Sequence, residues 1–412
     1  MDTLLRILDP MTEEHLVAVY DRLPLTAECG RGCYLFDAAG RRYLDMASGI
    51  GVNAFGYSNP RITAALTEQA GRCVHTSNLI SHPYQEELAR ELCRISGLDR
   101  AFFSNSGTEA MEAALKAVRS RSRSLDPTKT RLVSLEGSFH GRTLGSLSVS
   151  GQAKLRRRFE PLDRAVDFIR PNDQEALADV VTKATAAVIL EPILGEGGIR
   201  PLEIEFLRQA RELTKRLGAL LVADETQCGL GRTGKYFGYQ WAGVRPDIVV
   251  TAKPLAGGLP LGATLFTEEA AKHLPLHSHG TTFGGGPLAC RVALECLRLL
   301  EETLPRIADR ARQFRSRLDG LARRHSVVTQ IRSKGLMFGL ELSRPGRPFV
   351  VAALERGLLV NCTRETVLRL LPPYIVTRDE INRAVEILDL TFSAAPAGPP
   401  PRCRGQRRPP SP

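Results

Sequence analysis

The chain has 412 residues, of which 43% are hydrophobic and 25% charged, and it carries a formal net charge of +11. This composition is typical of an ordinary globular protein with a large core and two domains, and no apolar run approaches the roughly 20 residues of a membrane span. The positive charge does not indicate a nucleic-acid partner, because part of it lies in a Pro-rich C-terminal tail and part in the run 154–158, without a basic stripe interleaved with aromatics.

The N-terminus and the cysteines indicate the compartment. Residues 1–6 lack the basic and apolar regions of a signal peptide. The nine cysteines are scattered singly, and their odd number does not suit a disulfide framework. We therefore expect a cytoplasmic protein with reduced thiols and no membrane association.

The first predicted elements are a hairpin and a helix. Residues 32–46 alternate in the manner of a hairpin that turns at Ala39 and Gly40, and residues 60–73 carry apolar side chains at helical spacing. From about residue 84, strands alternate with helices, which is the pattern of βαβ units. The sequence therefore predicts an α/β fold with a mainly parallel central sheet flanked by helices.

A candidate phosphate site follows the first strand of this pattern. Residues 101–103 form a short strand, residues 104–108 a Ser/Gly/Thr turn, and residues 109–119 an Ala-rich helix. Such a turn offers unpaired N–H groups, hydroxyls and the positive end of the helix dipole to an anion. The alternative is a plain helix cap made by Ser106 or Thr108, and both interpretations can hold together.

Two later strands lead into loops with chemically capable side chains. The loop 137–143 carries Phe139, which is able to stack on a cofactor ring, and Arg142, which is able to bind a substrate carboxylate in a bidentate pair. The buried strand 186–190 ends in Glu191 and a Gly-rich loop that contains Glu196. The helix after it stops at Gly218, a suitable C-cap.

The chain is organised around the stretches 220–227 and 248–253. Each is an apolar run of strand length that ends in a polar residue, Asp224 in the first and Lys253 in the second. Ligands in α/β proteins bind beyond the carboxyl ends of such strands, so both side chains are expected in one crevice. A Lys that forms a Schiff base and an Asp that pairs with a pyridinium nitrogen suit pyridoxal phosphate. An ordinary interior ion pair is the alternative, and these two residues alone do not separate the two.

Two other patterns are weaker. The glycines of residues 229–234 imitate dinucleotide-binding and phosphate-binding loops, but both loops need a helix directly afterwards and residues 236–243 have no helical pattern. His273, His277 and His279 surround Pro275 without a Cys or carboxylate to complete a metal set. We therefore expect no metal site.

The C-terminal third is predicted to be a smaller unit. Residues 288–325 form a long amphipathic helix, and residues 328–390 read as α+β. We expect residues 1–50 to join this small domain, residues 51–280 to form the large domain, residues 281–393 to form the small domain, and the Ala/Pro/Arg-rich residues 394–412 to be disordered.

Five motifs in order resemble one family. The motifs are Ser106-Gly107-Thr108-Glu109-Ala110, Phe139-His140-Gly141-Arg142-Thr143, Glu191-Pro192-Ile193-Leu194-Gly195-Glu196-Gly197-Gly198, Asp224-Glu225-Thr226-Gln227 and Lys253. From about residue 20 to residue 390 the chain resembles the class III pyridoxal-phosphate-dependent aminotransferases. The stretches 20–24, 49–53, 76–79, 279–283 and 368–373 make it most similar to the acetylornithine aminotransferases among them.

The resemblance implies fold type I and assigns the cofactor contacts. Lys253 would carry the cofactor as a Schiff base and shuttle protons. Asp224 would keep the pyridine nitrogen protonated, Gln227 would contact the phenolic oxygen, and Phe139 would stack on the ring.

The resemblance also implies a homodimer with its active sites at the interface. Gly107 and Thr108 would hold the cofactor phosphate, joined by Thr282 from the second subunit.

The substrates follow from the same resemblance. The implied reaction moves the δ-amino group of N2-acetyl-L-ornithine to 2-oxoglutarate, which gives N-acetyl-L-glutamate 5-semialdehyde and L-glutamate in arginine biosynthesis. Arg142, with Thr281 nearby, would bind the α-carboxylate. Glu196 would mask Arg369 while the amine donor reacts and release it for the second carboxylate of the acceptor. Ornithine, succinylornithine, 4-aminobutyrate or carrier-bound lysine as donor, a glutamate-semialdehyde-type aminomutase and a non-catalytic relative remain alternatives.

The chain departs from the family pattern at several positions. Pro254 directly follows the implied Schiff-base lysine, and Arg364 and Glu365 replace a smaller, Gly-containing stretch. Met111 and Gly286 each stand where Asn is usual, and Thr281 stands where Ser is common. The changes at Pro254 and residues 364–365 bear on the shape of the pocket and hence on the substrate.

Overall fold

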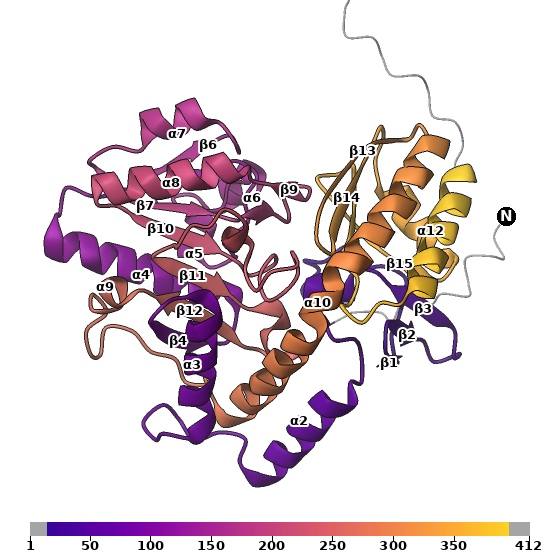
Figure 1. Cartoon of the computed structure of the whole chain (residues 1–412), viewed down its shortest axis with the longest axis horizontal. Coiled ribbons are helices and arrows are strands. Elements are labelled where there is room, and N and C mark those ends of the chain that lie inside the picture. The colour runs from indigo at the N-terminus through magenta and orange to yellow at the C-terminus, as the bar shows by residue number, and fades with distance from the viewer. Residues whose placement is uncertain (1–14, 395–412) are drawn as a thin grey trace, which may run out of the picture.

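The computed structural model describes residues 15–394 and is built around a seven-stranded sheet (Figure 1). The strand order is β4-β12-β11-β10-β7-β5-β6, and all neighbours are parallel except β12, which is antiparallel to β4 and β11. The predicted mainly parallel α/β fold is therefore confirmed. The strands are β4 (Arg100–Ser104), β5 (Arg131–Leu135), β6 (Val166–Ile169), β7 (Thr185–Leu190), β10 (Leu220–Asp224), β11 (Ile248–Thr251) and β12 (Gly262–Phe266).

Helices cover both faces of this sheet. Helix α4 (Gly107–Leu125) packs on one face, while α7 (Gln174–Val180) and α8 (Ile204–Leu217) pack on the other. Successive residues of β10 alternate between the two cores, with Val222 in the cluster under α4 and Leu221 in the cluster under α8. This burial on both faces explains why the central strands read as continuous apolar runs.

A smaller α+β unit combines the two ends of the described chain. In its first sheet, β1 (Cys29–Arg31), β2 (Tyr34–Phe36) and β3 (Arg42–Asp45) form the predicted hairpin region, and β3 pairs in parallel with β15 (Leu358–Leu359). The second sheet is antiparallel and has the order β13-β14-β17-β16. Its strands and the helices beside it are β13 (Val328–Lys334), β14 (Met337–Leu342), β16 (Asn361–Thr363), β17 (Val367–Leu370), α11 (Arg347–Glu355) and α12 (Arg378–Ser393).

The long helix α10 (Pro287–Arg324) joins the two units, as predicted for residues 288–325. The predicted helix at 60–73 is α2 (Pro60–Arg72). The exact domain boundaries stay predictions, and the predicted disordered tail, apart from residue 394, lies outside the described residues. The remaining elements are α1 (Ser48–Gly51), α3 (Pro83–Ser96), α5 (Leu144–Ser148), α6 (Ala153–Arg156), η1 (Arg157–Phe159), β8 (Ile193–Leu194), β9 (Arg200–Pro201), η2 (Gly238–Trp241), η3 (Lys253–Ala256) and α9 (Glu268–Ala271).

Several elements differ from the sequence prediction, and strand β6 is among those that were not predicted. Strand β12 was not predicted, because it directly follows a Gly/Pro turn and its pairing with β4 and β11 comes from distant parts of the chain. Helix α4 extends beyond the predicted 109–119 at both ends.

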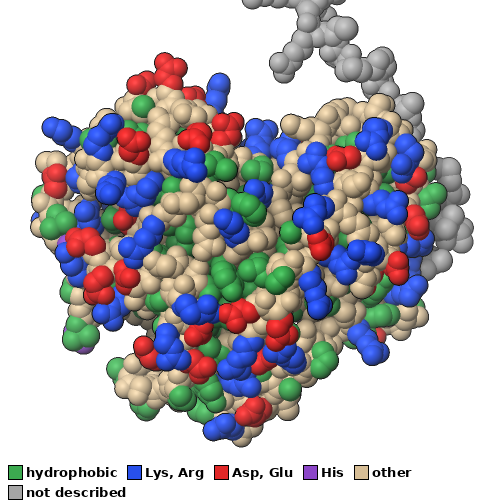
Figure 2. Space-filling model, viewed as in Figure 1, with side chains coloured by type: hydrophobic (Ala, Val, Ile, Leu, Met, Phe, Trp, Pro, Cys, Tyr) green, Lys and Arg blue, Asp and Glu red, His purple; other side chains and the backbone are tan. Residues whose placement is uncertain are grey.

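The surface is mixed in charge. On the face drawn in Figure 2, Lys and Arg side chains are interspersed with Asp and Glu. Within residues 15–394, no helix combines the length and apolar character that crossing a membrane requires.

Candidate active site

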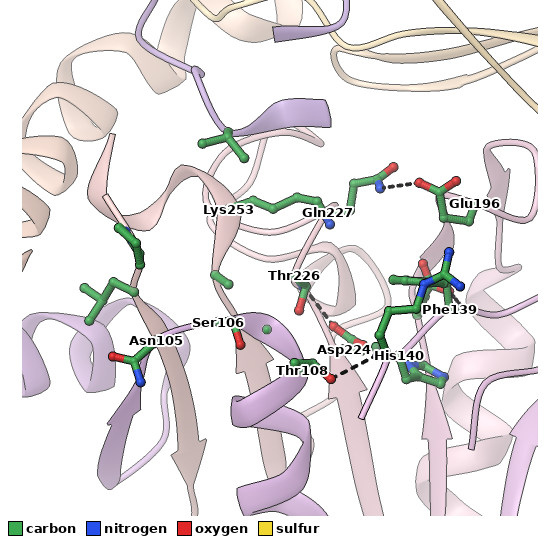
Figure 3. Close-up of a pocket in the computed structure, with 18 of the residues that line it drawn as sticks. Asn105, Ser106, Thr108, Phe139, His140, Glu196, Asp224, Thr226, Gln227 and Lys253 are labelled. Atoms are coloured by element: carbon green, nitrogen blue, oxygen red, sulfur yellow. Dashed lines mark hydrogen bonds and ion pairs between the residues drawn. The ribbon is translucent and has the colours of Figure 1, made fainter. Parts of the chain in front are cut away.

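The catalytic candidates meet at the carboxyl ends of the central strands (Figure 3). Strand β10 ends at Asp224, β11 ends two residues before Lys253, and β4 ends at Ser104, just before α4. Together they border a cavity of about 380 Å³. The other predicted site residues that line this cavity are Gly107, Thr108, Phe139, Arg142, Glu196 and Gln227.

Asp224 is a buried carboxylate held in place from two sides. His140 Nδ1 donates to Asp224 Oδ2 over 2.8 Å, and the Thr226 N–H donates to Asp224 Oδ1 over 3.0 Å. Burial on its own raises the pKa of Asp224, but the hydrogen bond and charge of His140, with the Thr226 bond, outweigh it and lower the pKa below its usual value. Asp224 is therefore ionised at neutral pH.

Lys253 is the amine of the site. Among the described residues its ammonium has no hydrogen-bond or ion-pair partner, so the two strand-end residues do not form an interior salt bridge. Burial lowers the pKa of Lys253 and outweighs the nearby Glu196 and Asp224, which raise it. A desolvated amine with a lowered pKa is suited to act as nucleophile and base.

The turn before α4 has the features of an anion site. Ser106 is the N-cap and its Oγ accepts from the Glu109 N–H over 3.3 Å, so the plain capping interpretation is correct for this residue. The next two N–H groups, of Gly107 and Thr108, have no acceptor in the described chain, as is usual for the first turn of a helix. A Cβ at Gly107 would lie 2.7 Å from Thr226 Cγ2, so only glycine fits there.

Glu191 organises two loops around the cavity. Its Oε1 accepts from the Phe139 N–H over 2.8 Å and its Oε2 from the Gly195 N–H over 3.0 Å. Burial raises the pKa of Glu191 to about 7. The Arg142 guanidinium lies 5.4 Å from the centre of the Phe139 ring. Glu191 thus positions the loop that carries the predicted ring-stacking and carboxylate-binding side chains.

Sequence reasoning assigned no role to His140 or Glu191. The signal for each was present, because His140 stands between the two functional residues of its loop and Glu191 ends a buried strand. What they contact is decided by chain segments far away in sequence.

Glu196 and Arg369 form the predicted ion pair. Arg369 is buried, with 2% of its surface exposed, and its Nη1 donates to Glu196 Oε1. Gln227 bridges the pair, since it donates to Glu196 over 3.4 Å and accepts from Arg369 over 3.3 Å. Burial raises the pKa of Glu196, but Arg369 outweighs it and the pKa is lowered. Glu196 lines the cavity and Arg369 does not, so the carboxylate covers the guanidinium.

Two predicted residues lie away from the cavity of this single chain. Thr281 Oγ1 accepts from the Asn105 side chain over 3.3 Å, and Thr282 is exposed. Neither is among the residues that line the cavity. The residues 15–394 contain no group of three His, Cys, Asp or Glu side chains able to hold a metal ion.

The side chains fit pyridoxal phosphate. The unpaired N–H groups of Gly107 and Thr108 suit its phosphate, the unpaired amine of Lys253 suits its aldehyde carbon, and the ionised Asp224 suits a protonated ring nitrogen. Thr226 Oγ1 is buried at the cavity without a partner among the described atoms, which leaves a further hydrogen-bonding group for a ligand.

Comparison with known proteins identifies the family. Residues 17–392 match the family described as aminotransferase class-III. The acetylornithine aminotransferases of Aquifex aeolicus and Methanocaldococcus jannaschii are 42% and 40% identical to this chain. The alignment with the first covers 91% of this chain and 98% of the relative, and that with the second covers 93% and 97%.

Solved structures confirm the predicted fold type I. An ornithine aminotransferase from Toxoplasma gondii, described with partial occupancy of pyridoxal phosphate at its active site, has a TM-score of 0.88 at 30% identity and covers 92% of each chain. The N-acetylornithine aminotransferase of Stenotrophomonas maltophilia has a TM-score of 0.79 at 34% identity and covers 91% of this chain and 97% of that one. The protein belongs to the class III aminotransferases, and its cofactor is pyridoxal phosphate.

Proposed function

We propose that the protein transfers the δ-amino group of N2-acetyl-L-ornithine to 2-oxoglutarate, giving N-acetyl-L-glutamate 5-semialdehyde and L-glutamate in arginine biosynthesis. The pairing of Glu196 with Arg369 beside the exposed Arg142 carries this proposal. Only Arg142 is available while the pair is closed, which matches a donor with one carboxylate. When the pair opens, the Arg369 guanidinium becomes a second cation at the site, which matches an acceptor with two carboxylates. The names of the similar proteins support the same donor.

Each residue of the cavity would have a separate role in the reaction. Bound pyridoxal phosphate supplies an electron sink for negative charge on the carbon that bears the amine. Lys253 Nζ would move the proton to and from that carbon, and the Asp224 carboxylate would hold a proton at the ring nitrogen. Phe139 would stack on the ring. Gln227 would contact the phenolic oxygen, while its hydrogen bonds hold Glu196 and Arg369 in place.

We also propose a cytoplasmic homodimer. Large apolar side chains are exposed near Thr281 and Thr282, including Leu79, Leu276 and Phe283, which are 95%, 86% and 67% exposed. A second copy that covers them would bring its Thr282 to the cofactor phosphate, where a single chain does not place it. The eight described cysteines are all free thiols, as is usual in a reducing compartment.

The donor assignment predicts a clear preference. With 2-oxoglutarate as acceptor, we expect kcat/KM for N2-acetylornithine to exceed that for ornithine by roughly tenfold or more, because the α-ammonium of ornithine would lie near the Arg142 guanidinium and repel it. Steady-state kinetics with N2-acetylornithine, ornithine and 4-aminobutyrate measure this. A preference for either of the other two donors would overturn the substrate proposal.

Removing the ion pair is expected to affect the two half-reactions unequally. In Glu196→Ala, Arg369 is unmasked during the donor reaction, so the donor meets a second cation that it does not need. We expect the donor half-reaction to slow by roughly tenfold, with the acceptor half-reaction within about threefold of wild type. Single-turnover absorbance changes of the cofactor follow each half separately. Equal damage to both halves would contradict the masking role. The control is Glu205→Ala, which removes an exposed carboxylate outside the catalytic cavity.

A further inference from the structure

A second cavity, of about 970 Å³, adjoins the catalytic one. Its walls come from α6 and β9 of the large unit and from the turn between β16 and β17 of the small unit, and in Figure 1 α6 and β9 lie on the side of the large unit that faces β14. Glu196 lines both cavities. We call the second cavity the outer groove.

The outer groove is rich in unpaired positive charge. The basic side chains that line it are Lys154, Arg156, Arg170, Arg200 and Arg364, against the acidic Glu136, Glu196 and Glu365. Glu196 is held by Arg369, and Glu365 lies 3.5 Å from Lys154. Within the described residues none of the four arginines forms an ion pair, and Arg156 lies instead 3.9 Å from the centre of the Phe168 ring.

Arg200 and Arg364 are close enough to affect each other. Burial first, and then the charges of Arg332 and Arg364, lower the pKa of Arg200 below its usual value. Arg332 is neutralised by Glu341, whose Oε2 lies 2.8 Å from its Nη2. Glu341 also raises the pKa of Arg200 but is outweighed, so an anion between Arg200 and Arg364 would relieve the remaining repulsion.

The groove is connected to the switch in the catalytic cavity. Thr363, next to Arg364 in the chain, donates from its Oγ1 to the backbone oxygen of Glu196 over 2.6 Å. On the opposite wall, a Cβ at Gly137 would lie 3.4 Å from Arg364 Nη1, so the guanidinium reaches the start of the loop that carries Phe139. A ligand held by Arg364 would therefore lie beside the Glu196 that covers Arg369.

We propose that Arg200 and Arg364 form an outer subsite that binds the dicarboxylate acceptor before Glu196 releases Arg369. This rests on the proposed function. The acceptor is a dianion, whereas N2-acetylornithine carries one carboxylate and one ammonium and has no net charge. A positive groove concentrates the dianion at the mouth of the cavity and leaves the donor unaffected. Arg200 and Arg364 thereby favour one substrate of the pair without touching the reacting atoms.

The test compares two double variants of equal charge. Arg200→Gln/Arg364→Gln removes the subsite, while Arg157→Gln/Arg158→Gln removes two exposed charges beside the groove that do not line it. At low ionic strength we expect the first variant to lose about fivefold in kcat/KM for 2-oxoglutarate, with the donor half-reaction within about twofold of wild type and the control variant nearly unchanged. The loss should shrink at about 1 M salt, where charges are screened beyond roughly 3 Å.

The acceptor half-reaction is measured on enzyme loaded with pyridoxamine phosphate, so its result does not depend on which donor the enzyme prefers. Equal losses in both halves, or the same loss in the control variant, would overturn the subsite while leaving the proposed function standing.

Direct binding separates a dicarboxylate site from a general anion site. Calorimetric titration of the holoenzyme with glutarate, which has the acceptor's two carboxylates without its keto group, should show weaker binding in Arg200→Gln/Arg364→Gln than in the control variant. Inorganic phosphate in a parallel titration should not show this difference. Glutarate binding that is the same in both variants, or phosphate binding that depends equally on the two arginines, would overturn the assignment to a dicarboxylate.

Discussion

Replacing Lys253 with alanine is expected to lower the rate of transamination by about 10⁴-fold or more, because the substitution removes the amine that attacks the cofactor and the base that moves the proton. Its ammonium faces the cavity without a partner, and burial has already lowered its pKa. The purified variant should also lose the visible absorbance of lysine-bound pyridoxal phosphate.

The control for this variant is Lys183→Ala, an exposed lysine outside the cavity. It should keep both the absorbance and the activity. Circular dichroism shows whether Lys253→Ala is folded, so an inactive but unfolded protein is not mistaken for support. A folded Lys253→Ala that retained activity within tenfold of wild type would refute the assignment of the catalytic lysine.

The second large effect is expected for Asp224→Asn, with a loss of about 10³-fold in kcat and a smaller change in KM. Asp224 is ionised because His140 and Thr226 hold its charged form. The neutral amide of asparagine has nearly the same shape but offers no negative charge to a protonated ring nitrogen. Steady-state kinetics at saturating substrates measure the loss.

The neighbouring residue provides a matched control. Glu225 is equally buried, but it accepts from the Tyr239 N–H over 2.9 Å and does not line the cavity. Burial raises the pKa of Glu225 to about 7, so its carboxyl is already partly neutral near that pH. Glu225→Gln should therefore stay within about tenfold of wild type. Similar losses in Asp224→Asn and Glu225→Gln would mean that Asp224 acts only through packing.

Local pattern was sufficient for many of the elements, though not for β12, and for the candidate residues at strand ends and in the phosphate turn. Helix α10 and the strands β10 and β11 were predicted because periodicity and apolar runs report burial directly. The convergence of Asp224 and Lys253 followed from the same reasoning, since parallel strands present their carboxyl ends at one edge of a sheet.

The resemblance to the family supplied what spacing did not, namely the pairing of Glu196 with Arg369. Those two residues are 173 positions apart in the sequence. The structure places the pair in contact, with Gln227 between them. It leaves Thr281 and Thr282 outside the cavity of one chain, and their roles stay predictions.

The sequence by itself determined the fold class and the strand ends that carry the chemistry, because these depend on hydrophobic periodicity. It indicated the cofactor through the family resemblance that its short motifs carry. The tertiary structure alone decided that His140, 84 positions away, holds Asp224, that Glu191 joins two loops, and that Arg200 and Arg364 both line the outer groove. The physical reason is that hydrogen bonds and charge clusters depend on distances between segments remote in the chain, and no local pattern encodes those distances.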